Sequence, residues 1–323
     1  MADGGSELLA RVGGQVIGRR RELELVLAAL AANRHILLEG PPGTGKSTLL
    51  RAVARELGVG FEFVEGNAEL TPARLVGHFD PARVITDGYS PDVYEDGPLA
   101  TALRDGSLLY VEEINRIPEE TLNVLVTVMS EGELHVPRLG RIAAQPGFRL
   151  VAAMNPFDAI GTARISGAIY DRVCRLSVGY QDAADEVAIV ESAIVESAIV
   201  TPSTGDDVVD RGWLAKVVEL VRRTRTHAEL RVGSSVRGAI DTAMVASSLA
   251  RLRGGKPTES SIGLDAALVA LSGRIRLREG ATRTTEEIVT QLWNEIFHPP
   301  DAAEAEGAND SSGKGPAPTG ANP

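Results

Sequence analysis

The stretch GPPGTGKS at residues 40–47 constrains the fold more than any other part of the sequence. It fits the pattern G-x-x-x-x-G-K-[ST]; it follows the apolar run HILLEG (35–40) and opens STLLRAVARELG (47–58), whose apolar spacing predicts a helix. A glycine-rich turn between a strand and a helix gathers backbone N–H groups and the helix N-terminus around an anion. The sequence therefore predicts a phosphate-binding loop, in which Lys46 carries the positive charge and the Ser47 hydroxyl serves as a ligand for Mg²⁺.

An acid pair stands at the end of a second apolar run, LLYVEE, at residues 108–113. Phosphoryl transfer needs an acidic group that holds the metal ion and a group that polarises the attacking water. Glu112 is therefore predicted to hold Mg²⁺, and Glu113 to activate the water. The alternative is a pair of surface acids after a core strand. The phosphate loop upstream favours the functional interpretation.

Strand and helix patterns alternate between residues 15 and 180, and the strand patterns fade after residue 180. Helices are predicted at 20–33, 47–58 and 119–132, strands at 35–40, 61–66, 108–113 and 148–155, and further helices near 183–200, 207–226, 234–253, 261–273 and 285–297. Alternating strands and helices form a parallel sheet that is covered on both faces. We expect an α/β domain at 15–180 and a small all-helical domain at 181–300. Residues 1–14 are expected to be an N-terminal tail and 301–323, rich in Gly, Pro, Ala and Asp, a disordered C-terminal tail.

Charge and composition limit the partners of the chain. The formal net charge of −11 is opposite to that of a protein that neutralises phosphate backbones, so no nucleic-acid partner is expected. There is no apolar run long enough for a membrane span and no apolar signal-peptide core near the N-terminus, so a cytoplasmic location is expected. Cys174 is the single cysteine, which excludes an internal disulfide; its place in RVCRLSV predicts a buried thiol.

The ordered set GPPGTGKS, VEEINR, AAMNP, YDRV and SSVRGAI resembles the AAA+ ATPases, and within them the MoxR family. The resemblance covers about residues 12–298, and the order of EINR and MNP is what narrows it to MoxR. It implies an AAA+ α/β domain followed by an α-helical lid. The stretch EGNAELTPARLVGHFDP resembles the branch linked to carbon monoxide dehydrogenase maturation.

The resemblance implies further roles for matching residues. Asn155 matches the sensor 1 residue that orients water, Arg172 the arginine finger that reaches the γ-phosphate of the neighbouring subunit, and Arg237 the sensor 2 arginine of the lid. Arg164 is a second candidate for the finger, and Arg116 also matches a position that faces the neighbour. An exposed or salt-bridged side chain is the alternative for each arginine.

The segment QVIG matches the stretch that packs on adenine. Residues expected to contact ATP or ADP are Val16, Ile17, Gly18, Pro42, Gly43, Thr44, Gly45, Lys46, Ser47 and Thr48. Residues expected to be catalytic are Lys46, Glu113, Asn155, Arg172 and Arg237, and those expected to hold Mg²⁺ are Ser47 and Glu112.

Two insertions also fit this group. Residues 81–97 fall where the family has a hairpin that interrupts its second helix, and residues 133–147 where a hairpin precedes the sensor 1 strand. One position departs from the family, because Glu112 replaces the usual aspartate. The extra methylene moves the carboxylate by roughly 1 Å, and misplacement on that scale costs about 10²-fold in rate. A working but slow ATPase is therefore expected.

The family implies an oligomeric ring, by default a hexamer, that hydrolyses ATP with Mg²⁺. It also implies a chaperone-like role in assembling or activating a client enzyme complex, or in inserting its metal or cofactor, with a partner that carries a von Willebrand factor A domain. Two alternatives stay open. One is a nucleotide-gated scaffold that barely turns over, and the other is a nucleic-acid-linked AAA+ motor.

Overall fold

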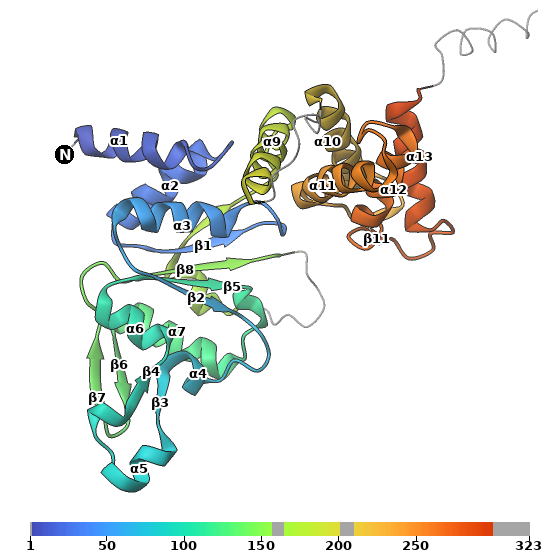
Figure 1. The fold of residues 1–323 in the computed structure, drawn as a ribbon. Helices are drawn as coiled ribbons and strands as arrows, with labels where there is room; N and C mark the ends of the chain where they lie inside the picture. The colour runs from blue at the N-terminus through green and yellow to red at the C-terminus, as the bar shows by residue number, and fades with distance from the viewer. Residues whose placement is uncertain (1, 157–164, 201–209, 300–323) are drawn as a thin grey trace, which may run out of the picture. The chain divides into compact units, whose positions relative to one another are not determined.

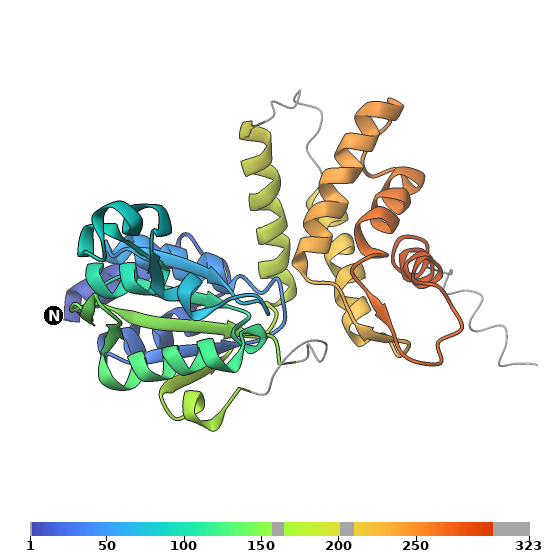
Figure 2. The same cartoon turned by 90° about the horizontal axis from the view of Figure 1, so that it is seen from below.

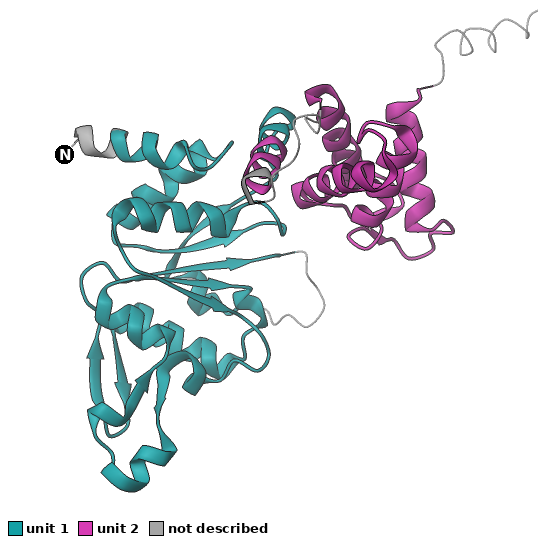
Figure 3. Ribbon diagram, in the orientation of Figure 1, with its two compact units in different colours: residues 1–189 teal, residues 190–323 magenta. Residues whose placement is uncertain are grey.

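The computed structural model describes residues 2–156, 165–200 and 210–299, and side chains from residue 7 onward except those of 198–200. The chain divides into two compact units, with the boundary along the chain between Ile189 and Val190 (Figure 3). This division falls inside the helix α9 (Ala183–Val200), whereas the sequence placed the start of the second domain at residue 181. Each unit is described separately below.

A five-stranded parallel sheet forms the centre of the first unit (Figure 1). Its strands are β1 (His35–Glu39), β2 (Phe61–Glu65), β5 (Leu108–Glu112), β8 (Arg149–Met154) and β9 (Val173–Ser177), in the order β2-β5-β8-β1-β9. Every neighbouring pair is parallel, so all carboxyl ends lie at one edge. The expected α/β fold is confirmed.

The edge strand β9 was not predicted, and the prediction of a buried thiol on it is wrong. Cys174 is exposed. Among the strands that the structure describes, β9 pairs with β1 alone, so it is an edge strand. Because side chains alternate along a strand, the apolar residues around Cys174 do not place it in the core.

Helices cover both faces of the sheet (Figure 2). On one face, α1 (Ala2–Gly13), α2 (Arg20–Ala31) and α3 (Lys46–Leu57) share a core with Tyr110 of β5. On the other face, the core contains residues of α4 (Pro72–Val76), α6 (Pro98–Asp105) and α7 (Glu119–Glu131). The sequence assigned residues 1–14 to a tail, but α1 forms there and its Val12 is fully buried.

Both expected hairpin insertions are present in the first unit. The strands β3 (Gly77–Phe79) and β4 (Tyr94–Asp96) pair antiparallel, with the helix α5 (Pro81–Asp87) and the short η1 (Pro91–Val93) between them. The strands β6 (Glu133–Val136) and β7 (Gly140–Ala143) form the second hairpin, which leads into β8. The two insertions touch, because the Arg138 guanidinium lies 3.7 Å from the centre of the Tyr89 ring.

The second unit contains α10 (Arg211–Thr226), α11 (Val236–Arg253), α12 (Ser260–Leu271) and α13 (Thr285–Phe297). Trp293 is fully buried and stacks on Phe297 with 3.8 Å between ring centres. A Cβ on Gly263 of α12 would lie 2.5 Å from the Trp293 ring, so only glycine lets these helices approach. The sequence did not predict the small antiparallel pair β10 (Leu230–Val232) and β11 (Arg276–Leu277).

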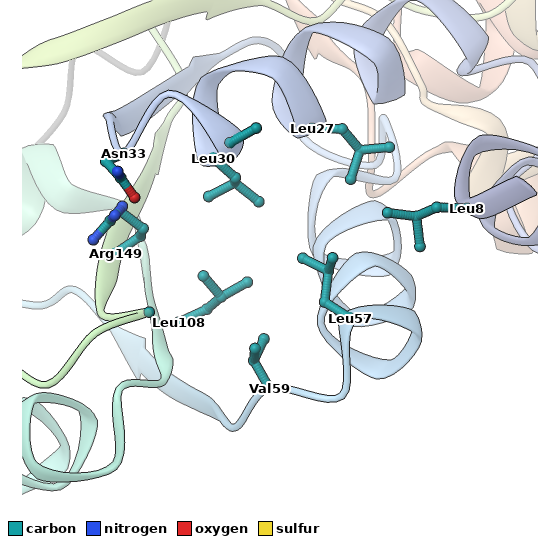
Figure 4. A pocket seen from close by; sticks show the side chains of 10 residues that line it. Leu8, Leu27, Leu30, Asn33, Leu57, Val59, Leu108 and Arg149 are labelled. Carbon is teal, nitrogen blue, oxygen red and sulfur yellow. The ribbon is translucent and has the colours of Figure 1, made fainter. Parts of the chain in front are cut away.

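An apolar hollow of about 370 Å³ lies in the first unit, and Leu8, Leu27, Leu30 and Leu57 line it (Figure 4). Its other lining residues include Leu108 and Arg149, the first residues of β5 and β8. The hollow is therefore at the amino ends of the strands, away from the phosphate loop. Over the ranges that the structure covers, no helix combines the length and apolar character needed to cross a membrane.

Candidate nucleotide-binding site

The phosphate loop joins the carboxyl end of β1 to the first turn of α3. Gly43 and Gly45 both have positive φ, at 72° and 79°, and α3 begins at Lys46 directly afterwards. Consecutive peptides in this geometry turn their N–H groups toward one concave side, which favours an anion. Glycine is required here because an L side chain rarely adopts these angles.

Lys46 lies inside this loop rather than in solvent. It is 7% exposed, and its Nζ donates to the carbonyl oxygens of Gly40 and Pro41 at 3.0 and 2.9 Å. The Thr44 hydroxyl also donates to the Pro41 carbonyl, at 3.0 Å. The ammonium group is therefore buried within the loop, against the carbonyl oxygens of its first two residues. Pro42, Thr48 and, outside the loop, Gly18 are the exposed members of the predicted nucleotide-contacting set.

Ser47 and Glu112 are brought together, as the motifs implied. The Ser47 hydroxyl donates to the two carboxylate oxygens of Glu112, at 3.2 and 3.4 Å. The Tyr110 hydroxyl lies 3.3 Å from Ser47 Oγ, a contact that the sequence analysis missed. Burial is the main cause that raises the pKa of Tyr110, so its hydroxyl keeps its proton.

Glu113 occupies a left-handed backbone position, with φ 52° and ψ 43°. This conformation is uncommon for a residue with a side chain and turns the chain sharply at the end of β5. The Glu113 carboxylate forms an ion pair with Arg116 of the short η2 (Ile114–Arg116). A Cβ on Gly66 would lie 2.3 Å from the Glu113 carbonyl oxygen, so glycine at the end of β2 makes room for this turn.

Asn155 follows β8, the strand between β1 and β5. The Gly40 N–H donates to the Met154 carbonyl at 3.1 Å, which ties the start of the phosphate loop to the residue before Asn155. Asn155 therefore ends the strand between the two motif strands, at the sheet edge that bears the loop and the acids. Arg164, the second candidate for the finger, lies outside the described residues.

Arg172 lies between the short helix α8 (Gly167–Tyr170) and β9. Its guanidinium donates to Ser130 Oγ at 2.5 Å and to the Ala168 carbonyl at 2.8 Å. Both contacts are within this chain, and they fix the arginine against α7 and α8.

The remaining predicted residues are in two places. Val16 is buried in the core on the α1–α3 face, and Gly18 has φ 68° with its Cα beside Asp185 of α9. Arg237 is exposed in the first turn of α11, in the second unit.

Two charged residues at the loop were missed by the sequence analysis. Arg19, 3% exposed, donates to the carbonyl oxygens of Thr44 and Gly179 at 2.8 and 2.6 Å. Glu39, the last residue of β1, accepts from Tyr170 at 2.9 Å and from Arg175 at 2.6 Å. The sequence feature that could have identified Glu39 is its position as a charged residue at the end of an apolar strand.

Known proteins resemble this chain in sequence and in fold. Residues 35–173 match the family described as the AAA domain, dynein-related subfamily. YeaC of Bacillus subtilis is 29% identical over 245 residues, 70% of this chain and 72% of that protein. The gas vesicle ATPase GvpN of Ancylobacter aquaticus is 30% identical over 239 residues, 68% of this chain and 62% of GvpN.

The protein MoxR of Methylorubrum extorquens is 34% identical over 157 residues, 49% of this chain and 44% of MoxR. The match thus spans less than two thirds of GvpN and less than half of MoxR. Among solved structures, the RuvB Holliday junction branch migration motor of Thermotoga maritima has a TM-score of 0.51 at 18% identity, over 78% of this chain and 70% of RuvB. That likeness shows the fold. The family match, the relatives and the phosphate-loop geometry together show that residues 35–173 resemble an AAA domain and that the chain is similar to AAA+ proteins of the MoxR family.

Proposed function

We propose that this protein hydrolyses ATP with Mg²⁺ at a site shared between two copies of the chain in a ring. The observation that carries the proposal is the convergence at one edge of the sheet. Lys46 lies inside the phosphate loop, Ser47 Oγ and the Glu112 carboxylate are 3.2 Å apart, and Asn155 follows the strand between the two motif strands.

The donor set fits Mg²⁺. Ser47 and Glu112 offer hard oxygen ligands, and Mg²⁺ in nucleotide sites is bound by one or two protein oxygens together with phosphates and water. The described part of the chain has no cluster of three or more His, Cys, Asp or Glu side chains that would form an all-protein metal site. Bound Mg²⁺ would neutralise charge on the β- and γ-phosphates.

The other residues take the roles that their positions permit. Lys46 would pair with the phosphates, Glu113 would accept a proton from the attacking water, and Asn155 would orient that water. Arg172 would reach the γ-phosphate held by a neighbouring copy, and Arg237 would contact the nucleotide from the helical unit. Val16, Ile17 and Gly18 would lie against adenine.

The proposal extends to the assembly and its purpose. AAA+ relatives support a homo-oligomer, and we propose a hexameric ring whose nucleotide cycle changes the position of the helical unit. The ring would act as a chaperone-like factor for a client enzyme complex, through a partner with a von Willebrand factor A domain. MoxR and the gas vesicle ATPase GvpN are the named relatives that favour this class over a nucleic-acid motor.

Steady-state ATP hydrolysis with Mg²⁺ tests the proposal, with assembly followed in parallel. Wild type is expected to turn over, and Lys46→Ala, Glu113→Gln and Arg172→Ala are each expected to lose hydrolysis. Arg55→Ala, an exposed residue in the last turn of α3 and outside the predicted nucleotide set, controls for unspecific damage to α3. Hydrolysis that survives Glu113→Gln or Arg172→Ala would refute these roles.

One observation favours a second candidate, a nucleotide-gated scaffold. The Glu113 carboxylate is ion-paired with Arg116, so it must leave this pair before it can face an attacking water. In a scaffold, ATP would drive assembly while hydrolysis stays slow until a partner separates the pair. Arg116→Ala distinguishes the two: faster turnover without a partner supports the gated scaffold, whereas unchanged or slower turnover supports the free-running ATPase.

A further inference from the structure

The contact between Tyr110 and Ser47 stands out because it is buried behind the nucleotide site and the family motif does not require it. Tyr110 is fully buried in β5, in the core that α3 shares with the sheet. Side chains two residues apart on a strand point to the same face. Tyr110 and Glu112 therefore both face α3, which carries Ser47, and Ser47 contacts both of them.

The direction of the hydrogen bonds follows from counting protons. A serine hydroxyl has one proton and two lone pairs. Ser47 donates its proton to Glu112, which as a carboxylate can only accept. With the serine proton on Glu112, the Tyr110–Ser47 contact uses the tyrosine proton, and the Tyr110 hydroxyl also interacts directly with Glu112, so the three groups form one hydrogen-bonded cluster. One lone pair of Ser47 Oγ remains for a metal ion.

We propose that Tyr110 is a positioning residue for the metal site, which fixes the Ser47 hydroxyl between itself and Glu112. The inference rests on the Mg²⁺-dependent nucleotide binding of the proposed function and deepens it. It also accounts for the glutamate at position 112. The longer acid reaches Ser47, and Tyr110 contacts the same hydroxyl, so Ser47 and Glu112 are oriented before the metal ion arrives.

The test is the Mg²⁺ dependence of binding of a fluorescent ATP analogue, measured without reference to turnover. Tyr110→Phe removes only the hydroxyl. It is expected to raise the Mg²⁺ concentration for half-maximal binding by about 3- to 10-fold, the scale of one lost hydrogen bond to a ligand. Binding of the analogue in EDTA is expected to stay unchanged, because Tyr110 does not face the phosphates.

Two comparisons make the test specific. Tyr94→Phe makes the same chemical change in the hairpin β3–β4, where the hydroxyl bonds the Val76 carbonyl, and is expected to leave the Mg²⁺ dependence unchanged. In a Ser47→Ala background, Tyr110→Phe is expected to have no further effect, because the tyrosine acts through Ser47. Tyr110→Leu, which also keeps the core apolar, replaces Tyr110→Phe if that variant does not fold.

The possible outcomes distinguish a failure of the positioning role of Tyr110 from a failure of the proposed metal site. If Ser47→Ala raises the Mg²⁺ requirement and Tyr110→Phe does not, the positioning role of Tyr110 is wrong while the metal site stands. Equal effects of Tyr110→Phe with and without Ser47 would also overturn the role. If neither Ser47→Ala nor Glu112→Gln changes the Mg²⁺ dependence, the proposed metal site itself is wrong.

Discussion

At the scale of single residues, the atypical acid at position 112 is matched to its surroundings. The Glu112 carboxylate is within hydrogen-bond distance of Ser47, at 3.2 Å, although the side chain is one methylene longer than the usual aspartate. This contact is already long for a hydrogen bond between oxygens, so the carboxylate of a shorter acid would no longer reach Ser47.

Shortening this acid is therefore expected to weaken the site. Glu112→Asp would withdraw the carboxylate by about 1 Å from Ser47, and the concentration of Mg²⁺ that supports half-maximal hydrolysis is expected to rise several-fold. The measurement is hydrolysis against Mg²⁺ concentration, with Glu62→Asp, an acid on β2 outside the site, as the matched control. Tighter Mg²⁺ binding or faster turnover in Glu112→Asp would show that the site is not adapted to glutamate.

A second residue-scale prediction concerns His35, the first residue of β1. Burial, with a smaller contribution from the charge of Arg149, lowers the pKa of His35 to about 4, and its Nδ1 accepts the Leu150 N–H at 2.9 Å. The unfolded chain binds this proton near pH 6.5 and the folded chain does not, so stability falls as the pH drops from about 6.5 toward 4.

Between pH 7 and pH 5 the loss from His35 is expected to be about 2 kcal/mol. Chemical denaturation at both pH values measures it, with His35→Gln as the test variant. His135→Gln, at an exposed position on β6, is the control. The wild type and the His135→Gln variant should share the loss, and His35→Gln should lack it. The same loss in all three proteins would remove His35 as the cause.

The sequence predicted the residues whose geometry is local. Lys46 and Ser47 follow a glycine-rich turn whose shape is set by neighbouring residues. By contrast, the partners of Arg19 and Glu39 are as many as 160 and 136 residues away along the chain, so no pattern in the sequence brings them together. The contact of Tyr110 with Ser47 spans 63 residues and was missed for the same reason.

At the scale of elements, apolar runs identified the central strands and the edge strand β2 but missed the other edge strand, β9. The strands β1, β5 and β8 are each paired on both sides and read as continuous apolar segments. The strand β9 carries Arg175 and a half-exposed pattern, so its signal is weak and it was not predicted. The helix α1 was missed because its sequence begins with small and polar residues.

The two hairpin insertions are connected by one contact, and this yields a prediction about their motion. The Arg138 guanidinium lies over the Tyr89 ring, and Tyr89 packs against Phe79 with 5.1 Å between ring centres. Since the β6–β7 hairpin leads directly into β8, the contact links β8 to the insertion that contains α5. We expect the two insertions to open together.

Arg138→Ala is expected to speed amide hydrogen exchange in residues 81–97 about 2- to 5-fold, since an exposed cation–π contact contributes roughly 0.5–1 kcal/mol. Exchange in β1 and β5 should stay as in wild type. Arg141→Ala, on the same hairpin and paired with Glu133, is the matched control and should not affect residues 81–97. Equal acceleration by both variants would mean that the whole hairpin, rather than this contact, restrains the insertion.

At the scale of the whole molecule, the residues that we propose for the nucleotide site belong to two compact units and, in the proposed ring, to two chains. Lys46, Glu113 and Arg172 are in the first unit, and Arg237 is in the second. Arg172 forms hydrogen bonds with α7 and α8 of its own chain. The central claim is that it nevertheless acts on the nucleotide bound by a neighbouring chain. An arginine finger contributes about 10³- to 10⁵-fold in phosphoryl transfer, so its loss is readily measured.

The most direct test mixes two inactive variants. Glu113→Gln keeps the finger and lacks the base, while Arg172→Ala keeps the base and lacks the finger, so each alone should be inactive. In a mixed ring, some junctions join an intact Glu113 from one subunit to an intact Arg172 from the next, and ATP hydrolysis should reappear on mixing. If hydrolysis stays absent in rings shown to contain both variants, Arg172 acts within its own chain or not at all, and the shared site is refuted.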